Sequence, residues 1–237
     1  MEGTMRYPDP GWRQETLSNA TLDDLVTRAR ALAQPGTRRL LGVTGPPGAG
    51  KSSVCGLLLQ VLADDAVLID MDGFHLANEE LVRLGRRDRK GAPDTFDVDG
   101  YTALLRRLRA QTTGVIYAPR FDRELEESVG SAVPVNYSTP LVITEGNYLL
   151  HQDGGWQDVA PQLDESWYIE VPTAERRSRL VRRRQDHGER RNQAEAWVEG
   201  VDSINGGIVE TTKCRADLII ELDRTVGPLP GVGRGTA

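Results

Sequence analysis

A glycine-rich loop, GPPGAGKS at residues 45–52, restricts the fold more than any other feature of this chain. An apolar stretch, RRLLGVTG at 38–45, leads into it, and an apolar segment from Lys51 to about Ala63 follows it. A second short apolar stretch, AVLID at 66–70, comes next. This order predicts strand, loop, helix and strand. Two strands joined through a helix in this way run parallel in one sheet.

The loop fits the spacing G-x-x-x-x-G-K-[ST], which is typical of phosphate binding. Glycines let backbone N–H groups form a nest for an anion, and the following helix directs its positive N-terminus to the same place. Lys51 can then reach the β- and γ-phosphates, and the Ser52 hydroxyl can ligate Mg²⁺. The alternative, a glycine-rich turn without function, is less consistent with the flanking strand and helix. The residues predicted to bind ATP are Gly45, Gly48, Ala49, Gly50, Lys51, Ser52 and Ser53.

The 237 residues suit one α/β domain with a sizeable core. We predict a three-layer sandwich of the P-loop NTPase type, with a mainly parallel five-stranded sheet between helices and a small helical lid at about 173–195. The domain covers 1–225 with an arm at 1–20, irregular through residue 17, and a flexible Gly/Pro-rich tail at 226–237. Further strands are predicted within 140–150 (ending near Glu145), at 166–171 and at 216–220, with a short one at 114–119; further helices are predicted at 22–32, 98–110, 173–185 and 191–211.

Charge and composition exclude several classes of protein. The net charge of −6 argues against a general nucleic-acid binder. No apolar run is long enough to cross a bilayer, and the N-terminus lacks the pattern of a signal peptide. Cys55 and Cys214 form neither a zinc spacing nor a disulfide framework. These features predict a cytoplasmic protein without nucleic-acid or membrane partners, and the lack of an N-K-x-D motif argues against a signalling GTPase.

Acidic residues follow two of the predicted strands. Asp70 and Asp72 stand at the carboxyl end of 66–70, where parallel sheets bind ligands, and both point to the same side if the extended geometry continues. Asp72 is the candidate base for an acceptor hydroxyl, although either aspartate could instead cap the next turn. Glu145 ends another apolar strand before a glycine. A buried carboxylate there needs a partner such as Mg²⁺, unless it is a cap or turn residue.

An arginine-rich segment, RRSRLVRRRQDHGERR, lies in the second half of the chain. Arginine binds phosphate through forked hydrogen bonds, although most of these side chains are expected on a solvated helix face. Arg184 and Arg190, near the helix end, are the candidates to reach phosphates, and Arg184 is the predicted catalytic one. His75 is a candidate substrate contact or a structural histidine, whereas His151 and His187 lack metal-ligand spacing.

The motifs GPPGAGKSS, DMDGFH, GAPDTFD, APRFDRE and VITEGNYLL occur in this order before the arginine-rich segment. Their order and spacing, across roughly residues 38–222, resemble the P-loop kinases grouped with uridine kinase, phosphoribulokinase and bacterial pantothenate kinase. The resemblance implies that Asp72 is the catalytic base and that Glu145 assists the magnesium site. It also implies acceptor-site loops at Phe96–Asp97 and Arg120–Glu124, with Phe96 and Arg120 as substrate contacts. The lid arginine that steadies the phosphoryl group stays open among Arg182, Arg183, Arg184 and Arg190.

The same resemblance implies a kinase that uses ATP and Mg²⁺ to phosphorylate a hydroxyl of a small metabolite, such as a nucleoside, a sugar or a pantothenate-like compound. Within the group, the sequence is most similar to sugar kinases associated with fructose transport and to nucleoside kinase-like proteins. The alternative is a nucleotide-binding regulatory protein without turnover, against which the intact Asp72 and Glu145 argue. The sequence does not identify the acceptor, and it leaves a homodimer open.

Overall fold

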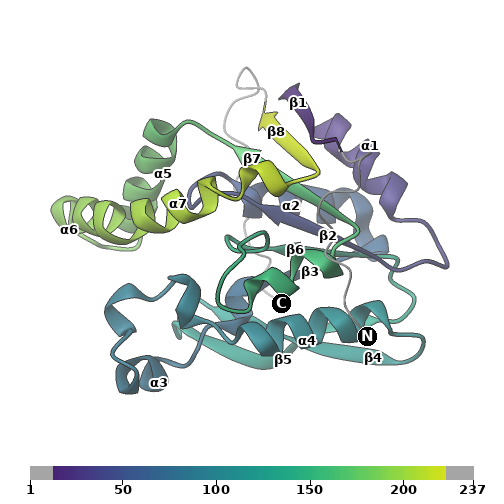
Figure 1. Cartoon of the computed structure of the whole chain (residues 1–237), viewed down its shortest axis with the longest axis horizontal. Coiled ribbons are helices and arrows are strands. Elements are labelled where there is room, and N and C mark those ends of the chain that lie inside the picture. The colour runs from purple at the N-terminus through teal and green to yellow at the C-terminus, as the bar shows by residue number, and fades with distance from the viewer. Residues whose placement is uncertain (1–12, 223–237) are drawn as a thin grey trace.

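A parallel sheet forms the centre of the computed structural model, which describes residues 13–222 (Figure 1). Within these residues the sheet has six strands in the order β1-β8-β7-β2-β6-β3, and each pair of neighbours is parallel. The five predicted strands are therefore confirmed as β2, β3, β6, β7 and β8. The bounds are β1 (Glu15–Ala20), β2 (Arg39–Thr44), β3 (Ala66–Asp70), β6 (Leu141–Glu145), β7 (Glu165–Glu170) and β8 (Leu218–Leu222).

Strand β1 is the one that the sequence analysis missed. It lies partly in the arm that was expected to be irregular through residue 17, and it adds a sixth strand by pairing with β8. Its side chains are largely exposed, and Ala20 alone among its six residues is buried. An edge strand held by backbone hydrogen bonds needs no apolar alternation, so the pattern carried no signal for it. Residues 1–12 of the predicted arm and the predicted tail at 226–237 lie outside the described residues.

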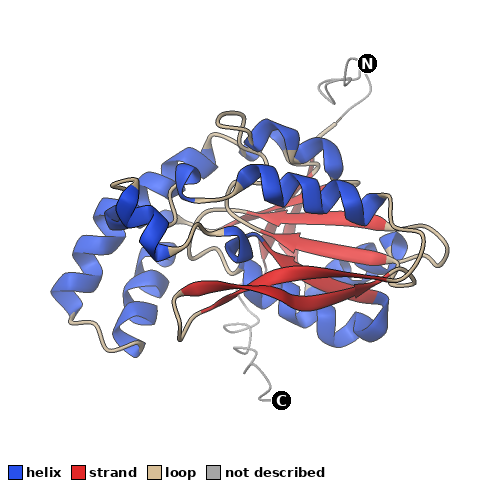
Figure 2. Cartoon of the chain, turned by 90° about the horizontal axis from the view of Figure 1, so that it is seen from below, coloured by secondary structure: helices blue, strands red, loops and turns tan. Residues whose placement is uncertain are grey.

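Helices cover both faces of the sheet, and this confirms the three layers (Figure 2). α1 (Leu22–Leu32) and α2 (Lys51–Leu62) share one apolar core, in which Leu58 is fully buried. α4 (Val98–Arg109) contributes Tyr101 to a second core on the opposite face. Because α2 begins directly at the glycine-rich loop, its packing on the sheet fixes that loop at the carboxyl end of β2.

A two-stranded antiparallel sheet adds to the second core. Its strands are β4 (Val115–Asp122), which extends the short strand predicted at 114–119, and β5 (Glu127–Asn136), which was not predicted. The backbone of this hairpin passes very close to the turn after β3. A Cβ atom on Gly73 would lie 2.8 Å from the carbonyl oxygen of Pro119, so only glycine fits there without a shift. The hairpin is thereby held beside the turn that carries Asp72.

The arginine-rich segment and the residues after it form helices that project from one end of the sheet (Figure 1). The predicted helix at 191–211 is interrupted by a π-helical turn at Val198–Asp202. α5 and α6 occupy the segment predicted as a lid, and its role as a lid stays a prediction. None of the helices within residues 13–222 has the length and apolar character needed to cross a membrane. The bounds are α3 (Asn78–Arg83), α5 (Thr173–Asp186), α6 (Arg191–Trp197) and α7 (Ser203–Glu210).

Candidate active site

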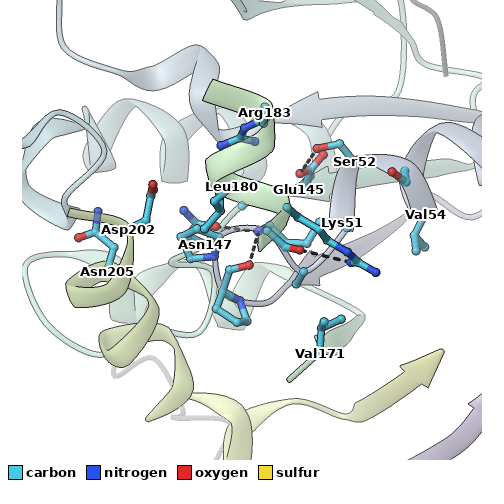
Figure 3. A pocket seen from close by; sticks show the side chains of 18 of the residues that line it. Lys51, Ser52, Val54, Glu145, Asn147, Val171, Leu180, Arg183, Asp202 and Asn205 are labelled. Carbon is cyan, nitrogen blue, oxygen red and sulfur yellow. Dashed lines mark hydrogen bonds between the residues drawn. The ribbon is translucent and has the colours of Figure 1, made fainter. Parts of the chain in front are cut away.

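A cleft of about 2090 Å³ lies at the carboxyl ends of β2, β3 and β6 (Figure 3). The glycine-rich loop, the turn after β3, the β4–β5 hairpin and the helices α5 to α7 all contribute to its walls. Gly45 does not line it, because this glycine packs against the backbone of β7 at Ile169. The predicted site residues that do line the cleft are Gly48, Ala49, Gly50, Lys51, Ser52, Ser53, Asp72, His75, Glu145 and Arg184.

Lys51 lies at the bottom of the glycine-rich loop. Gly50 adopts a left-handed backbone with φ of 94°, which turns the chain from the loop into α2 and sets Lys51 as the first helical residue. The Lys51 ammonium donates to the Gly45 carbonyl at 2.8 Å and to Asn147 Oδ1 at 2.7 Å. Burial lowers the pKa of Lys51, and the nearby Glu145 carboxylate opposes that shift. The loop therefore holds a buried cation beneath its backbone.

Ser52 and Glu145 form a pair next to this lysine. The Ser52 hydroxyl donates to Glu145 Oε1 at 2.7 Å, across the gap between the start of α2 and the end of β6. Glu145 is buried, and burial raises its pKa while the Lys51 charge opposes that rise. The sequence analysis assigned both residues to magnesium, and the structure brings them into direct contact.

The oxygen donors of this pair fit a magnesium ion. Mg²⁺ prefers hard oxygen ligands and is usually held by one or two protein oxygens together with substrate phosphates and water. Within the described residues, no group of three or more His, Cys, Asp or Glu side chains could hold a metal alone. A hydroxyl and a carboxylate beside a phosphate-binding loop match a site in which protein oxygens, substrate phosphates and water together coordinate Mg²⁺.

Asp70 and Asp72 differ in their surroundings although they are two residues apart. β3 ends at Asp70, opposite Glu145 in the register of β6, and the chain then enters a 3₁₀ turn at Met71–Phe74. The extended geometry assumed from the sequence therefore stops before Asp72. Asp70 Oδ1 accepts a hydrogen bond from the Asp72 N–H at 2.8 Å, so it caps the turn, which was one of the alternatives. Burial raises the pKa of Asp70 well above its usual value, and the charges of Asp72 and Glu145 add to this.

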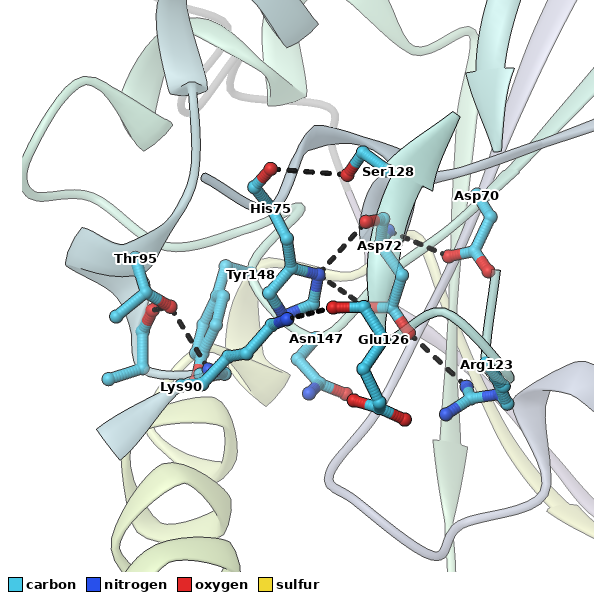
Figure 4. Close-up of polar contacts among 12 residues, drawn as sticks. Asp70, Asp72, His75, Lys90, Thr95, Arg123, Glu126, Ser128, Asn147 and Tyr148 are labelled. Carbon is cyan, nitrogen blue, oxygen red and sulfur yellow. Dashed lines mark hydrogen bonds and ion pairs between the residues drawn. The ribbon is translucent and has the colours of Figure 1, made fainter. Parts of the chain in front are cut away.

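Asp72 faces the cleft and is partly exposed. Its Oδ2 lies 3.4 Å from Nη2 of Arg123, on the β4–β5 hairpin (Figure 4). His75 Nδ1 lies 4.0 Å from Asp72 Oδ1 and 2.9 Å from the Asp72 carbonyl oxygen. Burial lowers the pKa of His75, and Asp72 opposes this shift. A neutral His75 can donate Nδ1–H to that carbonyl, which fixes the ring beside the aspartate.

Two of the predicted substrate contacts lie elsewhere. Phe96 is buried, and its ring centroid lies 4.1 Å from that of His75, so Phe96 packs against the histidine ring. Arg120 is exposed in β4 opposite Val129 and is not among the residues that line the cleft. Arg123, three residues later in the same motif, takes the position beside Asp72. The turn between β4 and β5 reverses the chain after Asp122, and a motif alone does not show where such a reversal falls.

The lid arginines also differ from one another. Arg184 stacks on Trp197 at 4.5 Å and pairs with Glu189, so its guanidinium is held within the α5–α6 unit. Arg183 lines the cleft, and its side chain is exposed to solvent. The protein groups around it still remove part of its hydration, and this desolvation lowers its pKa. Arg182 also lines the cleft, whereas Arg190 does not. The charges of Asp72 and Arg123 both act on the pKa of Arg183, so Arg183 lies in the electrostatic field of this carboxylate.

The sequence analysis missed Asn147, which is the side-chain partner of Lys51. Its signal was available, because Asn147 follows the Glu145–Gly146 step at the same strand end, where ligand-binding side chains gather. It also missed Lys90, which lines the cleft from the loop after α3. That segment is polar and arginine-rich, and its sequence gives no reason to prefer one cation over another.

Comparison with known proteins places this geometry in a family. No protein-family model matches the chain. The chain is 31% identical over 213 residues to "Putative uridine kinase C227.14" of Schizosaccharomyces pombe, with 85% of this chain and 91% of the relative covered. It is 36% identical to a solved "putative fructose transport system kinase" from Silicibacter, with a TM-score of 0.77 over 84% of this chain and 98% of that one. The chain belongs to the P-loop kinases of the uridine kinase and pantothenate kinase group.

A further relative extends the match within this group. The pantothenate kinase of Leifsonia xyli is 34% identical over 172 residues, which cover 69% of this chain and half of that protein. These relatives support a phosphotransferase, so the alternative of a regulatory protein without turnover is not favoured. The kinase phosphorylates a small molecule, and P-loop kinases in general use ATP with Mg²⁺. The resemblance inferred from the motifs is thereby confirmed.

Proposed function

We propose that this P-loop kinase transfers the γ-phosphoryl group of ATP to a hydroxyl of a small metabolite, with Asp72 as the general base. One observation carries the proposal. Of the three carboxylates that line the cleft at this edge of the sheet, Asp70 caps a turn and Glu145 accepts from Ser52, whereas, within residues 13–222, Asp72 accepts only a long hydrogen bond, at 3.4 Å from Arg123 to its Oδ2. An acceptor hydroxyl in the cleft can therefore reach Asp72 Oδ1 without displacing the hydrogen bond that Arg123 donates to Oδ2.

The contacts of the glycine-rich loop indicate where ATP, the phosphoryl donor, binds in the proposed reaction. Lys51 exchanges its carbonyl and Asn147 partners for the phosphates of ATP, and the loop N–H groups add further donors. Ser52 and Glu145 would hold Mg²⁺, directly or through water, and the bound ion would neutralise charge on the phosphates. Arg183 from α5 reaches the same space and is our choice for the arginine that contacts the transferring group.

The acceptor oxygen attacks the γ-phosphorus, and a new P–O bond forms while the bond from that phosphorus to the oxygen of ADP breaks. The hydroxyl proton passes to the Asp72 carboxylate, which releases it to solvent after the product leaves. Preorganised positive charge from Lys51 and Arg183 stabilises the phosphoryl oxygens during transfer.

The test is ADP release from ATP across sugars, sugar acids, sugar phosphates, nucleosides and pantothenate, with mass spectrometry of the phosphorylated product. We expect at least one hydroxylated acceptor to raise ADP release well above the rate with water alone. A competition between ATP and GTP should favour ATP, because the chain has no guanine-reading motif. Folded protein that binds ATP but phosphorylates none of these acceptors would contradict the proposal.

A further inference from the structure

A lysine on the acceptor side of the cleft lacks a charged partner. Lys90 follows a 3₁₀ turn at Arg87–Arg89 and lines the same cleft as Asp72. Its ammonium donates to Asn78 Oδ1 at 2.9 Å and to the Glu126 carbonyl at 2.6 Å, both of which are uncharged oxygens. Among residues 13–222, no carboxylate lies within ion-pair distance of Lys90. An ammonium has three donors, so one donor and the full charge remain for a ligand.

The surroundings of Lys90 make this arrangement costly without a ligand. The side chain is partly buried, and its ammonium lies 4.9 Å from the centre of the buried Phe121 ring. Burial lowers the pKa of Lys90, while the more distant charges of Glu127 and Glu126 oppose that shift. Glu127 is already engaged with the Asn78 N–H. A cation held in a cleft with a spare donor is a typical anion-binding group.

Lys90 contacts Asn78 and the β4–β5 hairpin, through the Glu126 carbonyl and the Phe121 ring, whereas Lys51 contacts its own loop and Asn147. The charge of Asp72 affects the pKa values of both Lys51 and Lys90, whereas Lys90 acts on the neighbouring His75. Figure 4 shows Lys90 and Arg123 on either side of His75 and Asp72. Both cations pack near the same Phe121 ring, with the Arg123 guanidinium 6.0 Å from its centre. Two positive groups therefore lie near the Phe121 ring, in the neighbourhood of the proposed general base Asp72.

We propose that the acceptor is a hydroxylated metabolite that also carries an anionic group, a carboxylate or a phosphate, and that Lys90 binds this group. The inference rests on the proposed function, because it takes the hydroxyl beside Asp72 as the reacting group. The triphosphate of ATP is held at the other end, by Lys51 and its loop, so the anion at Lys90 belongs to the acceptor. A neutral sugar or nucleoside leaves the Lys90 charge unpaired and binds more weakly.

The experiment uses matched sets of acceptors with the full chain. Each set contains a neutral sugar, the corresponding sugar acid and the corresponding sugar phosphate, at five and six carbons, with pantothenate and its neutral alcohol as a further pair. ADP release gives kcat/KM for each compound. We expect a charged member to exceed its neutral partner by about 10- to 100-fold, as for a charge-assisted contact. The sugar acid and sugar phosphate arms distinguish a carboxylate from a phosphate.

Variants separate anion binding from support of the loop. Lys90→Met keeps the length of the side chain but removes its charge and its two hydrogen bonds, and Lys90→Arg keeps the charge. Lys90→Met should raise KM for the charged acceptor about 10- to 100-fold and change KM for the neutral one little. Lys90→Arg should recover part of the loss. Arg83→Met is the matched control, because Arg83 is an exposed cation of α3 that pairs with Glu80, and it should behave as the wild type.

Each outcome has a distinct meaning. A preferred neutral acceptor, or an equal loss for charged and neutral acceptors in Lys90→Met, overturns the anion site and leaves the kinase proposal intact. An equal loss would mean that Lys90 only tethers its loop to Glu126 and Asn78. No turnover with any compound in folded, ATP-binding protein counts against the proposed function, and the anion site falls with it.

Discussion

The two ends of the cleft hold their polar side chains in different ways. At the nucleotide end, Lys51, Ser52 and Glu145 are buried or hydrogen-bonded to one another and to the loop backbone. These residues come from the end of β6 and the first turn of α2, both of which are fixed by the core of the sheet. Little has to move for this end to receive a triphosphate.

At the acceptor end, the side chains come from separate loops and remain partly exposed. Asp72 lies in a 3₁₀ turn, Lys90 in the loop after α3, and Arg123 in the turn between β4 and β5. The contact of Arg123 with Asp72 is long, at 3.4 Å. Specificity for an acceptor can therefore change through loops while the nucleotide end stays constant.

This contrast indicates which end each substitution should affect. Residues at the nucleotide end should change the use of ATP with every acceptor, because all acceptors share that donor. Residues at the acceptor end should change the chemical step or the choice of acceptor and leave ATP affinity nearly constant. Asp72 stands at the boundary between the two ends, so its substitution is the strictest test of the division.

Asp72→Asn should give the largest effect. The amide keeps the size of the side chain but cannot accept the hydroxyl proton, and general base catalysis contributes about 10²–10⁴-fold. We expect kcat to fall by that factor while the affinity for ATP barely changes, measured by steady-state kinetics and ATP titration. Near-normal kcat, or a loss of ATP binding instead, would move the catalytic assignment away from Asp72.

Asp70→Asn is the matched control for that variant. The substituted side chain retains an oxygen that can accept from the Asp72 N–H, so the cap of the turn is preserved. We expect a smaller loss of kcat than for Asp72→Asn. If Asp70→Asn is the more damaging of the two, then Asp70 has a chemical role that its capping contact does not explain.

Lys51→Ala should produce the next largest effect, at the other end of the cleft. The ammonium is the buried cation of the phosphate loop, and a charge-assisted contact is worth about 1.5–3 kcal/mol. A loss of at least tenfold to a hundredfold in kcat/KM for ATP is expected, with every acceptor alike. Circular dichroism checks that the variant folds. A loss confined to one acceptor would break the division between the two ends.

Arg123→Ala and Arg120→Ala form a smaller comparison within one motif. Arg123 lies beside Asp72 and lines the cleft, whereas Arg120 does neither. Because Arg123 is largely exposed, its contact is worth at most ~1 kcal/mol, so its removal should lower kcat/KM for the acceptor roughly fivefold. Arg120→Ala should stay close to the wild type. The reverse order would restore Arg120 as the acceptor contact inferred from the motif.

The sequence predicted the glycine-rich loop between β2 and α2 for a physical reason. A phosphate loop needs glycines, a lysine and a hydroxyl at fixed spacing between a strand and a helix, so a short stretch of sequence is enough to predict its geometry. The acceptor end depends on how distant loops meet, and no local pattern records that the β4–β5 turn brings Arg123 rather than Arg120 to Asp72. Strand β1 was missed because backbone pairing to β8, not burial of its side chains, holds it.

The smallest expected effect is a pH dependence that originates at the acceptor end. Burial lowers the pKa of His75 in the folded state, so below its ordinary pKa of 6.5 the unfolded chain binds more protons than the folded one. Stability contributed by this histidine is therefore present above pH 6.5 and is lost as the pH falls from there, by at most about 1.4 kcal/mol per pH unit. Urea unfolding between pH 7.5 and pH 5.5, at about half-unit steps, measures the slope.

His75→Gln removes the titrating ring but retains a side chain that can donate to the Asp72 carbonyl. Its free energy of unfolding should be lower than that of the wild type at pH 7.5, because contacts with Phe96 and Phe121 are lost. Its decline with falling pH should nevertheless be shallower. His187→Gln, at an exposed histidine of the α5 end, should keep the wild-type slope. Since the buried carboxyl groups of Asp70 and Glu145 titrate in all three proteins, they cancel in the comparison. Parallel slopes for the wild type and His75→Gln would show that His75 titrates freely, and the acceptor end would then be more open to solvent than its ring contacts indicate.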